Sequence, residues 1–93
     1  MLYYTYITTN PRKNVFYTGV TNNLRRRMKE HREYRGERKH FTGRYFCHKL
    51  VYFETFERIK DAIAREKAIK NLSREKKIKL ITAKNPNLHT YVL

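Results

Sequence analysis

The chain has 93 residues, enough for one modest hydrophobic core but too few for two, so residues 1–93 are expected to form a single domain with a single site. Lys and Arg number 22 against 8 Asp and Glu, and the net charge of +14 predicts a polyanionic partner, because each phosphate contact releases condensed counterions. The lone Cys47 excludes an intramolecular disulfide, and the absence of a leader or of about twenty consecutive apolar residues predicts a cytoplasmic protein with no membrane segment.

The first two predicted elements are strands joined by a turn. Leu2 to Thr8 is rich in aromatic and β-branched residues, and Val15 to Val20 follows the turn-forming stretch Thr9 to Asn14. The short connection predicts an antiparallel hairpin. Because side chains alternate along a strand, this hairpin can bring Tyr6 and Tyr17 together on one face.

A basic helix is expected after the hairpin, running from the caps Asn22 and Asn23 to about Tyr34. Its inward positions recur at helical spacing: Leu24, Met28 and His31. The following stretch, Arg35 to His48, is basic and contains two glycines. This composition indicates a loop or a broken helix.

Three more elements follow in the second half of the chain. Leu50 to Glu54 is predicted to be a strand and Glu57 to Leu72 a helix. Ser73 caps a third helix that runs to about Ala83, and Pro86 prevents its extension. The predicted order is ββαβαα, which is a small α+β domain.

The third arginine of the first helix borders the inward stripe. At 100° per residue Arg27 lies within about sixty degrees of Leu24. Its guanidinium either reaches across the sheet face toward Tyr17 to hold a phosphate oxygen, or stays in water above its packed methylenes. His31 is typical of a partly buried packing residue, with catalysis as the other interpretation. The remaining basic residues predict a solvated face that contacts phosphates: Arg25, Arg26, Lys29 and Arg32.

The second helix carries a carboxylate in its apolar stripe. The stripe is expected to consist of Ile59, Ala62, Ile63 and Ile69. Glu66 lies at its centre, where a carboxylate is costly unless it is paired or bound to a cation. An ion pair with Lys70 at i+4 is one explanation. The other is that Glu66 binds a hard divalent cation such as Mg²⁺ through oxygen.

Other metal sites have less support. A two-metal site is not expected, because no second acid shares the face of Glu66. A zinc site built from His31, His40, Cys47 and His48 would fit no common ligand spacing. The seven acids other than Glu66 lie near Lys or Arg and are expected to balance surface charge.

Several motifs, taken in order, resemble a known family. Tyr4-Thr-Tyr6 and Tyr17-Thr-Gly19, followed by Leu24-x-x-Arg27-x-x-x-His31, resemble the signature of the GIY-YIG nucleases. Ala64-Arg-Glu66-Lys-x-Ile-Lys70, and later Asn85-Pro86, are similar to a small stand-alone bacterial subgroup of that superfamily. The resemblance covers nearly the whole chain. This chain has Tyr4-Thr where the name motif has Gly-Ile, and Thr18 where the second motif has Ile.

The resemblance implies a three-stranded antiparallel sheet flanked by helices and a metal-dependent endonuclease that hydrolyses phosphodiester bonds in DNA, in repair or recombination. The catalytic residues that it implies are Tyr6, Tyr17, Arg27 and His31. It implies Glu66 as the ligand of a single Mg²⁺ or Mn²⁺ ion, and Asn85 as an additional site residue.

The alternative is a catalytically silent nucleic-acid-binding module with the same fold. A binding module has no reason to keep a carboxylate beside a phosphate site, where it repels the ligand, so the enzyme is favoured. A protein partner that supplies specificity is compatible with either. The residues expected to contact nucleic acid, with DNA as the expected partner, are Arg25, Arg26, Lys29, Arg32, His40, Arg44 and Lys70.

Overall fold

The computed structural model describes residues 1–33, 36 and 45–93. Its elements are β1 (Tyr3–Thr9), β2 (Phe16–Thr21), α1 (Leu24–Glu33), β3 (Lys49–Phe56), α3 (Ile59–Lys70) and α4 (Arg74–Lys84). The strands form one antiparallel sheet in the order β2-β1-β3. The predicted α+β class and the order ββαβαα are confirmed, with element ends shifted by a few residues. The loop predicted over residues 35–48 lies mostly outside the described residues.

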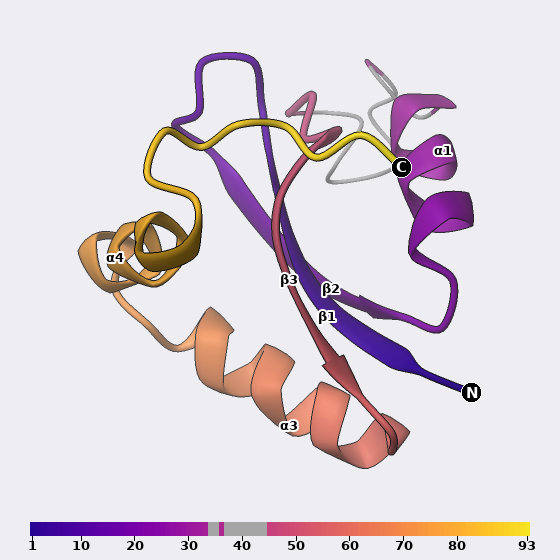
Figure 1. Cartoon of the computed structure of the whole chain (residues 1–93). Helices are drawn as coiled ribbons and strands as arrows, with labels where there is room; N and C mark the ends of the chain where they lie inside the picture. Colours follow the sequence, from indigo (N-terminus) through magenta and orange to yellow (C-terminus); the bar gives the residue numbers. More distant parts are fainter. Residues whose placement is uncertain (34–35, 37–44) are drawn as a thin grey trace.

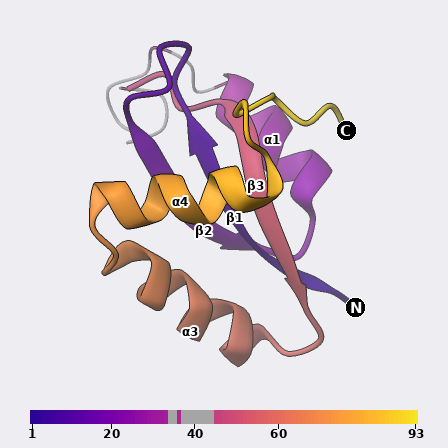
Figure 2. The same cartoon turned by 60° about the vertical axis from the view of Figure 1, so that its left-hand side comes forward.

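The sheet separates two layers of helix. α1 covers one face, and α3 and α4 lie on the other (Figure 1). In the turned view α4 crosses the strands beside α3 (Figure 2). β1 is the middle strand, so its side chains alternate between the two layers. Among the described helices, none combines the length and the apolar character needed to cross a bilayer.

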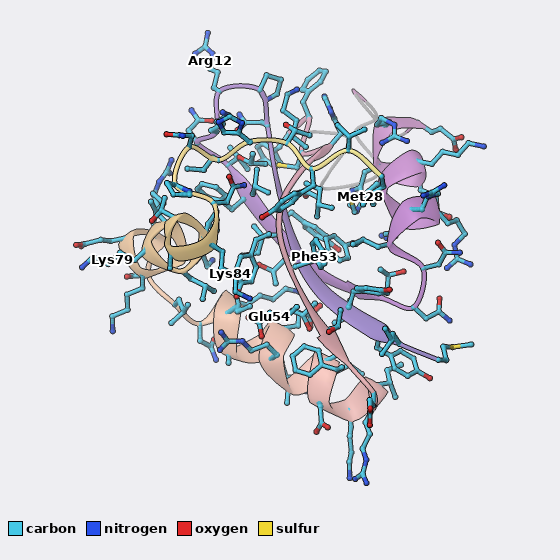
Figure 3. The ribbon with its side chains drawn as sticks, in the orientation of Figure 1. Arg12, Met28, Phe53, Glu54, Lys79 and Lys84 are labelled. Atoms are coloured by element: carbon cyan, nitrogen blue, oxygen red, sulfur yellow. The ribbon has the colours of Figure 1, made fainter. Side chains whose placement is uncertain are left out.

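Each face of the sheet carries its own apolar cluster. The cluster under α1 contains Tyr6, Leu24, Met28 and Leu50. The cluster under α3 and α4 contains Ile7, Val51, Tyr52, Ile69 and Ile81. Figure 3 shows Met28 and Phe53 toward the α1 side, and Glu54 and Lys84 toward α3 and α4. Neighbouring residues of one strand, such as Tyr6 and Ile7 of β1, therefore belong to different apolar clusters.

The start of α1 is set by side chains that satisfy its first backbone groups. The Asn23 side-chain oxygen accepts a hydrogen bond from the Arg26 N–H at 3.0 Å. The Thr21 hydroxyl oxygen accepts one from the Asn23 N–H at 3.1 Å. Because the helix begins at Leu24, its inward positions are Leu24, Met28 and His31, all of which are buried as predicted.

The inward face of α3 differs from the predicted stripe. Ile59 and Ile63 are 51% and 38% exposed, so their predicted burial is wrong, whereas Ala62 and Ile69 are fully buried. The Thr5 hydroxyl donates to the Ala62 carbonyl at 2.7 Å, which holds the helix backbone so close to β1 that a small side chain fits there. With Ala62 facing the sheet, Ile63 is turned about 100° away from it.

The segment after α4 is held by one buried amide. The Asn85 side chain donates to the carbonyl oxygens of Val51 and His89, at 2.9 and 2.8 Å, and accepts from the His89 N–H at 3.0 Å. Further along, the Tyr91 N–H donates to the Leu50 carbonyl at 2.8 Å. Asn85 therefore ties the end of α4 and the C-terminal segment to β3.

Replacing Asn85 with Ala is expected to lower the free energy of unfolding by about 2 to 3 kcal/mol, because it removes three hydrogen bonds and leaves a buried carbonyl without a partner. The matched control is Asn87→Ala, which truncates an exposed asparagine in the same segment and should cost less than about 0.5 kcal/mol. Urea unfolding followed by circular dichroism measures both. Equal losses in the two variants would contradict the anchoring role.

Candidate active site

The two signature tyrosines meet over a glycine. In the β1–β2 register Tyr6 is opposite Gly19. A Cβ added at Gly19 would lie 2.5 Å from the Tyr6 hydroxyl oxygen and 3.0 Å from Cε2 of Tyr17. The rings of Tyr6 and Tyr17 have centroids 6.3 Å apart. The prediction that the hairpin brings these tyrosines together is confirmed, and the absence of a side chain at Gly19 makes the approach possible.

The Tyr6 hydroxyl joins two residues of α1. Its oxygen lies 2.9 Å from His31 Nε2 and accepts a hydrogen bond from Arg27 Nε at 3.3 Å. Nη1 of Arg27 also forms an ion pair with the Glu30 carboxylate at 3.0 Å. Of the two interpretations of Arg27, the structure has the guanidinium reaching the sheet face, where its contact is Tyr6.

Burial extends the pH range over which both partners of this hydrogen bond stay neutral. Tyr6 is 1% exposed, and burial raises its pKa against the lowering effect of the Arg27 hydrogen bond, with the charges of Tyr17 and Glu66 adding to the rise. His31 is fully buried, and burial together with the Arg27 charge lowers its pKa to about 4. The pair is therefore an uncharged tyrosine and an uncharged imidazole.

His31 also touches the second tyrosine. Its ring centroid lies 5.6 Å from that of Tyr17, the same separation as from Tyr6. Within the described residues its buried Nδ1 has no hydrogen-bond partner. Nδ1 of His31 can therefore still donate or accept a hydrogen bond, depending on the tautomer of the ring.

Arg27 supplies the positive charge of this cluster. Burial lowers the pKa of its guanidinium, but the hydrogen bonds with Tyr6 and Glu30 outweigh that effect and the net shift is upward. The side chain is 30% exposed, so its other N–H groups can be reached from solvent. A guanidinium in this position can offer paired donors to a phosphate.

Glu66 brings a carboxylate to the same region from α3. It lies on the inward face between Ala62 and Ile69, and its side chain is 20% exposed. The Lys70 ammonium is 3.4 Å away, so the predicted ion pair is present. The Glu66 charge contributes to the raised pKa of Tyr6. Among the described residues no group of three or more His, Cys, Asp or Glu could hold a metal ion, so a cation here would rely on Glu66.

Of the other predicted site residues, Lys70 reaches the cluster through its ion pair with Glu66, and the rest are exposed on α1, bonded to backbone groups or outside the described residues. Four side chains are exposed on α1, and a fifth is exposed on α3: Arg25, Arg26, Lys29, Arg32 and Lys70. His40 and Arg44 fall outside the described part of the chain. The hydrogen bonds of Asn85 described above all go to backbone groups.

Sequence reasoning missed a second polar cluster, beside α3. Glu54 is expected from the sequence to be a surface acid, but its side chain is 20% exposed, and its two carboxylate oxygens share the Arg65 Nε–H, at 3.2 and 3.1 Å. The Tyr52 hydroxyl donates to the same carboxylate, and burial with this bond raises the pKa of Tyr52 to about 12. Arg65 precedes Glu66, so this ion pair fixes α3 next to the carboxylate of the site. The position of Glu54 follows from the pairing of β1 with β3, which places Glu54 opposite Thr5. This pairing cannot be read from the local sequence around Glu54.

The stability of the protein should fall as the pH drops from about 6.5 to 4. In that window the unfolded state protonates His31 and the folded state does not, because the pKa is about 4 in the fold and near 6.5 in a free histidine. The lost stability should be about 2 to 3 kcal/mol, measured by urea unfolding across the pH range. His31→Gln should flatten this dependence and His89→Gln, at an exposed position, should keep it. An unchanged pH slope in His31→Gln would contradict the assignment.

A family comparison agrees with this geometry. The model of the GIY-YIG catalytic domain matches residues 2–79, which include β1, β2, α1, β3 and α3. Tyr6, Tyr17, Arg27 and Glu66 all lie within the matched range. The match therefore spans the whole cluster described above.

Relatives and a solved structure point the same way. The chain is 45% identical over 75 residues to a UPF0213 protein of Clostridium perfringens, covering 81% of this chain and 78% of that one. It is 37% identical over 79 residues to a UPF0213 protein of Staphylococcus haemolyticus, covering 85% and 93%. The solution structure of a UPF0213 protein from Bacillus halodurans aligns with a TM-score of 0.57 and 31% identity, over 94% of this chain and 89% of that chain. By its domain, its relatives and its fold, the chain belongs to the GIY-YIG family and, within it, to the UPF0213 proteins.

Proposed function

We propose that this chain is a metal-dependent endonuclease that hydrolyses phosphodiester bonds in DNA. The observation that carries the proposal is the cluster of Tyr6, His31 and Arg27 beside Tyr17, with the Glu66 carboxylate near it. The net charge of +14 supports a polyanionic substrate. The GIY-YIG domain has a nuclease fold, and the residues that the family resemblance implies as catalytic meet in one place.

The two tyrosines differ in what they can do. Tyr6 is buried and bonded on both sides of its hydroxyl, so it positions Arg27 and His31. Tyr17 is more exposed, so we assign it the contact with the attacking water. The water oxygen bonds to phosphorus while the bond to the leaving oxygen breaks. The proton from the water passes by way of Tyr17 to solvent, because the lowered pKa of His31, about 4, makes this imidazole a weak proton acceptor at pH 7.

Arg27 and Glu66 handle the charge of the reacting phosphate. The exposed N–H groups of Arg27 bind its oxygens and offset the negative charge that builds up in the transition state. Glu66 fits a hard divalent ion, since Mg²⁺ in proteins commonly uses one or two carboxylates together with water and phosphate oxygens. Such an ion, Mg²⁺ or Mn²⁺, would stabilise the leaving oxygen. Lys70 forms an ion pair with one oxygen of this carboxylate at 3.4 Å, so the ion would compete with Lys70 for its negative charge.

The same ion pair favours the second candidate function, a catalytically silent nucleic-acid-binding module. With Lys70 as its partner, Glu66 has a structural reason to be on this face that needs no metal. The two functions therefore differ in what the carboxylate does. Removing its charge separates them.

Glu66→Gln is expected to lower the rate of DNA cleavage in Mg²⁺ or Mn²⁺ by about a hundredfold or more, because it removes the charged metal ligand, while DNA affinity stays within about twofold. Glu75→Gln is the matched control: Glu75 also pairs with a lysine four residues later, Lys79, but is exposed on α4 and should keep full activity. A panel of labelled duplex, single-stranded and branched DNAs gives the rates. Binding by all three proteins with no cleavage by any of them would favour the silent module.

Gly19→Ala tests whether cleavage depends on the position of the Tyr6 hydroxyl, which the missing side chain at Gly19 makes possible. The new methyl group would overlap the buried Tyr6 ring and displace its hydroxyl from His31 and Arg27, so cleavage should fall at least about tenfold at an unfolding cost of about 1 to 3 kcal/mol. Tyr6→Phe should lower activity by a similar factor. Because both changes act through one hydroxyl, the double variant should be little worse than either single variant. Multiplicative losses in the double variant would contradict this.

A further inference from the structure

A groove runs along the outer edge of β2, next to Tyr17. Its inner section has a volume of about 290 Å³ and is lined by Phe16, Tyr17, Thr18, Lys70 and Lys77. β2 is an outer strand of the described sheet, and the connection from α3 to α4 lies on its side of the molecule (Figure 2). We name this hollow, with the section described next, the β2-edge groove.

The outer section continues the groove away from the site. It has a volume of about 280 Å³ and adds Asn14, Val15 and Arg74 to the shared residues Phe16 and Lys77. The shared lining makes the two sections neighbours in one track. The track leads from Tyr17 past the start of α4.

The cationic side chains of the groove differ in whether they already have a partner within the protein. Lys70 contacts Glu66 at 3.4 Å, and Arg74 donates a hydrogen bond to the Asn14 carbonyl. Lys77 lines both sections and forms no ion pair with the acids of the described residues. It is half-buried, so its methylenes lie along the groove while its ammonium remains available. Lys77 is therefore the charge best suited to a phosphate here.

Besides its cations and the polar Asn14 and Thr18, the groove is lined by apolar and aromatic side chains, which determine the kind of nucleic acid that fits. Val15, Phe16 and Tyr17 are half-buried side chains that line the groove. A duplex stacks its base faces inside and presents phosphates and sugars, which a purely charged surface would match. Unpaired bases expose apolar faces next to their phosphates, and surfaces that bind single strands combine cations with aromatic rings.

We propose that the β2-edge groove binds an unpaired strand of nucleic acid that continues from the phosphate at Tyr17, with Lys77 contacting its backbone and Phe16 its bases. The proposal rests on the proposed function in one respect, namely that a phosphodiester is bound at Tyr17. It adds a surface on the opposite side of that site from the basic face of α1. The groove thus selects substrates that carry a single-stranded segment beside the cleaved bond.

The experiment compares Lys77→Gln with Lys76→Gln, which removes the same charge from an exposed neighbour on α4 that does not line the groove. Binding is measured by fluorescence anisotropy without divalent metal, over a series of salt concentrations. The probes are a labelled single-stranded DNA, a duplex with a single-stranded overhang and a blunt duplex. Lys77→Gln should weaken the first two about three- to tenfold and lower the salt slope for the single strand by about 0.7. Lys76→Gln should change every affinity by less than about twofold.

Lys77→Arg should bind as the wild type does, and thermal unfolding followed by circular dichroism checks that each variant is folded. Equal losses for Lys77→Gln and Lys76→Gln, or a loss by Lys77→Gln that is as large on the blunt duplex, would overturn the proposal. Because these readouts need no cleavage, the groove is tested separately from the nuclease activity. If Lys77→Gln weakens single-strand binding but no protein cleaves DNA, the groove proposal holds and the proposed nuclease function fails. If DNA is cleaved but Lys77→Gln binds as the wild type does, the nuclease function holds and the groove proposal fails.

Discussion

The hydrogen bonds of the buried Tyr6 hydroxyl are the constraint on which the candidate site depends. One oxygen holds His31 and Arg27, which lie one helical turn apart on α1, and it reaches them across a strand that has no side chain at Gly19. The same burial lowers the pKa of His31 and raises that of Tyr6, so Arg27 carries the charge of the trio. Polar groups are tolerated inside an apolar cluster because they bond to one another.

Much of the architecture follows from local patterns in the sequence. The turn between two aromatic and β-branched stretches is enough to predict the β1–β2 hairpin, and alternation then places Tyr6 and Tyr17 on one face. The helical spacing of Leu24, Met28 and His31 predicts the buried face of α1. These signals are strong because each depends on residues close together in the chain. The catalytic roles rest on the family resemblance and stay predictions.

Features set by long-range contacts were not visible in the sequence. The inward face of α3 depends on the bond from Thr5 to Ala62, which joins residues 57 positions apart, and this is why Ile59 and Ile63 are exposed. Glu54 resembles any acid near basic residues until the sheet register and α3 bring Arg65 to it. Neither contact has a periodic signature, because each results from how a helix docks on a sheet.

The alternation of side chains along β1 assigns neighbouring residues of one short strand to two different layers of the structure. Tyr4 and Tyr6 belong to the cluster under α1, while Thr5 and Ile7 face α3 and the second core. Mutations at the odd-numbered positions act first on how well the helices are held, and those at the even-numbered positions act first on the shape of the site. A substitution in β1 can therefore change the stability of the fold or the shape of the candidate site, depending on which of the alternating positions it occupies. Of the two residues that differ from the family's Gly-Ile, Tyr4 lies on the α1 side of the sheet and Thr5 on the α3 side.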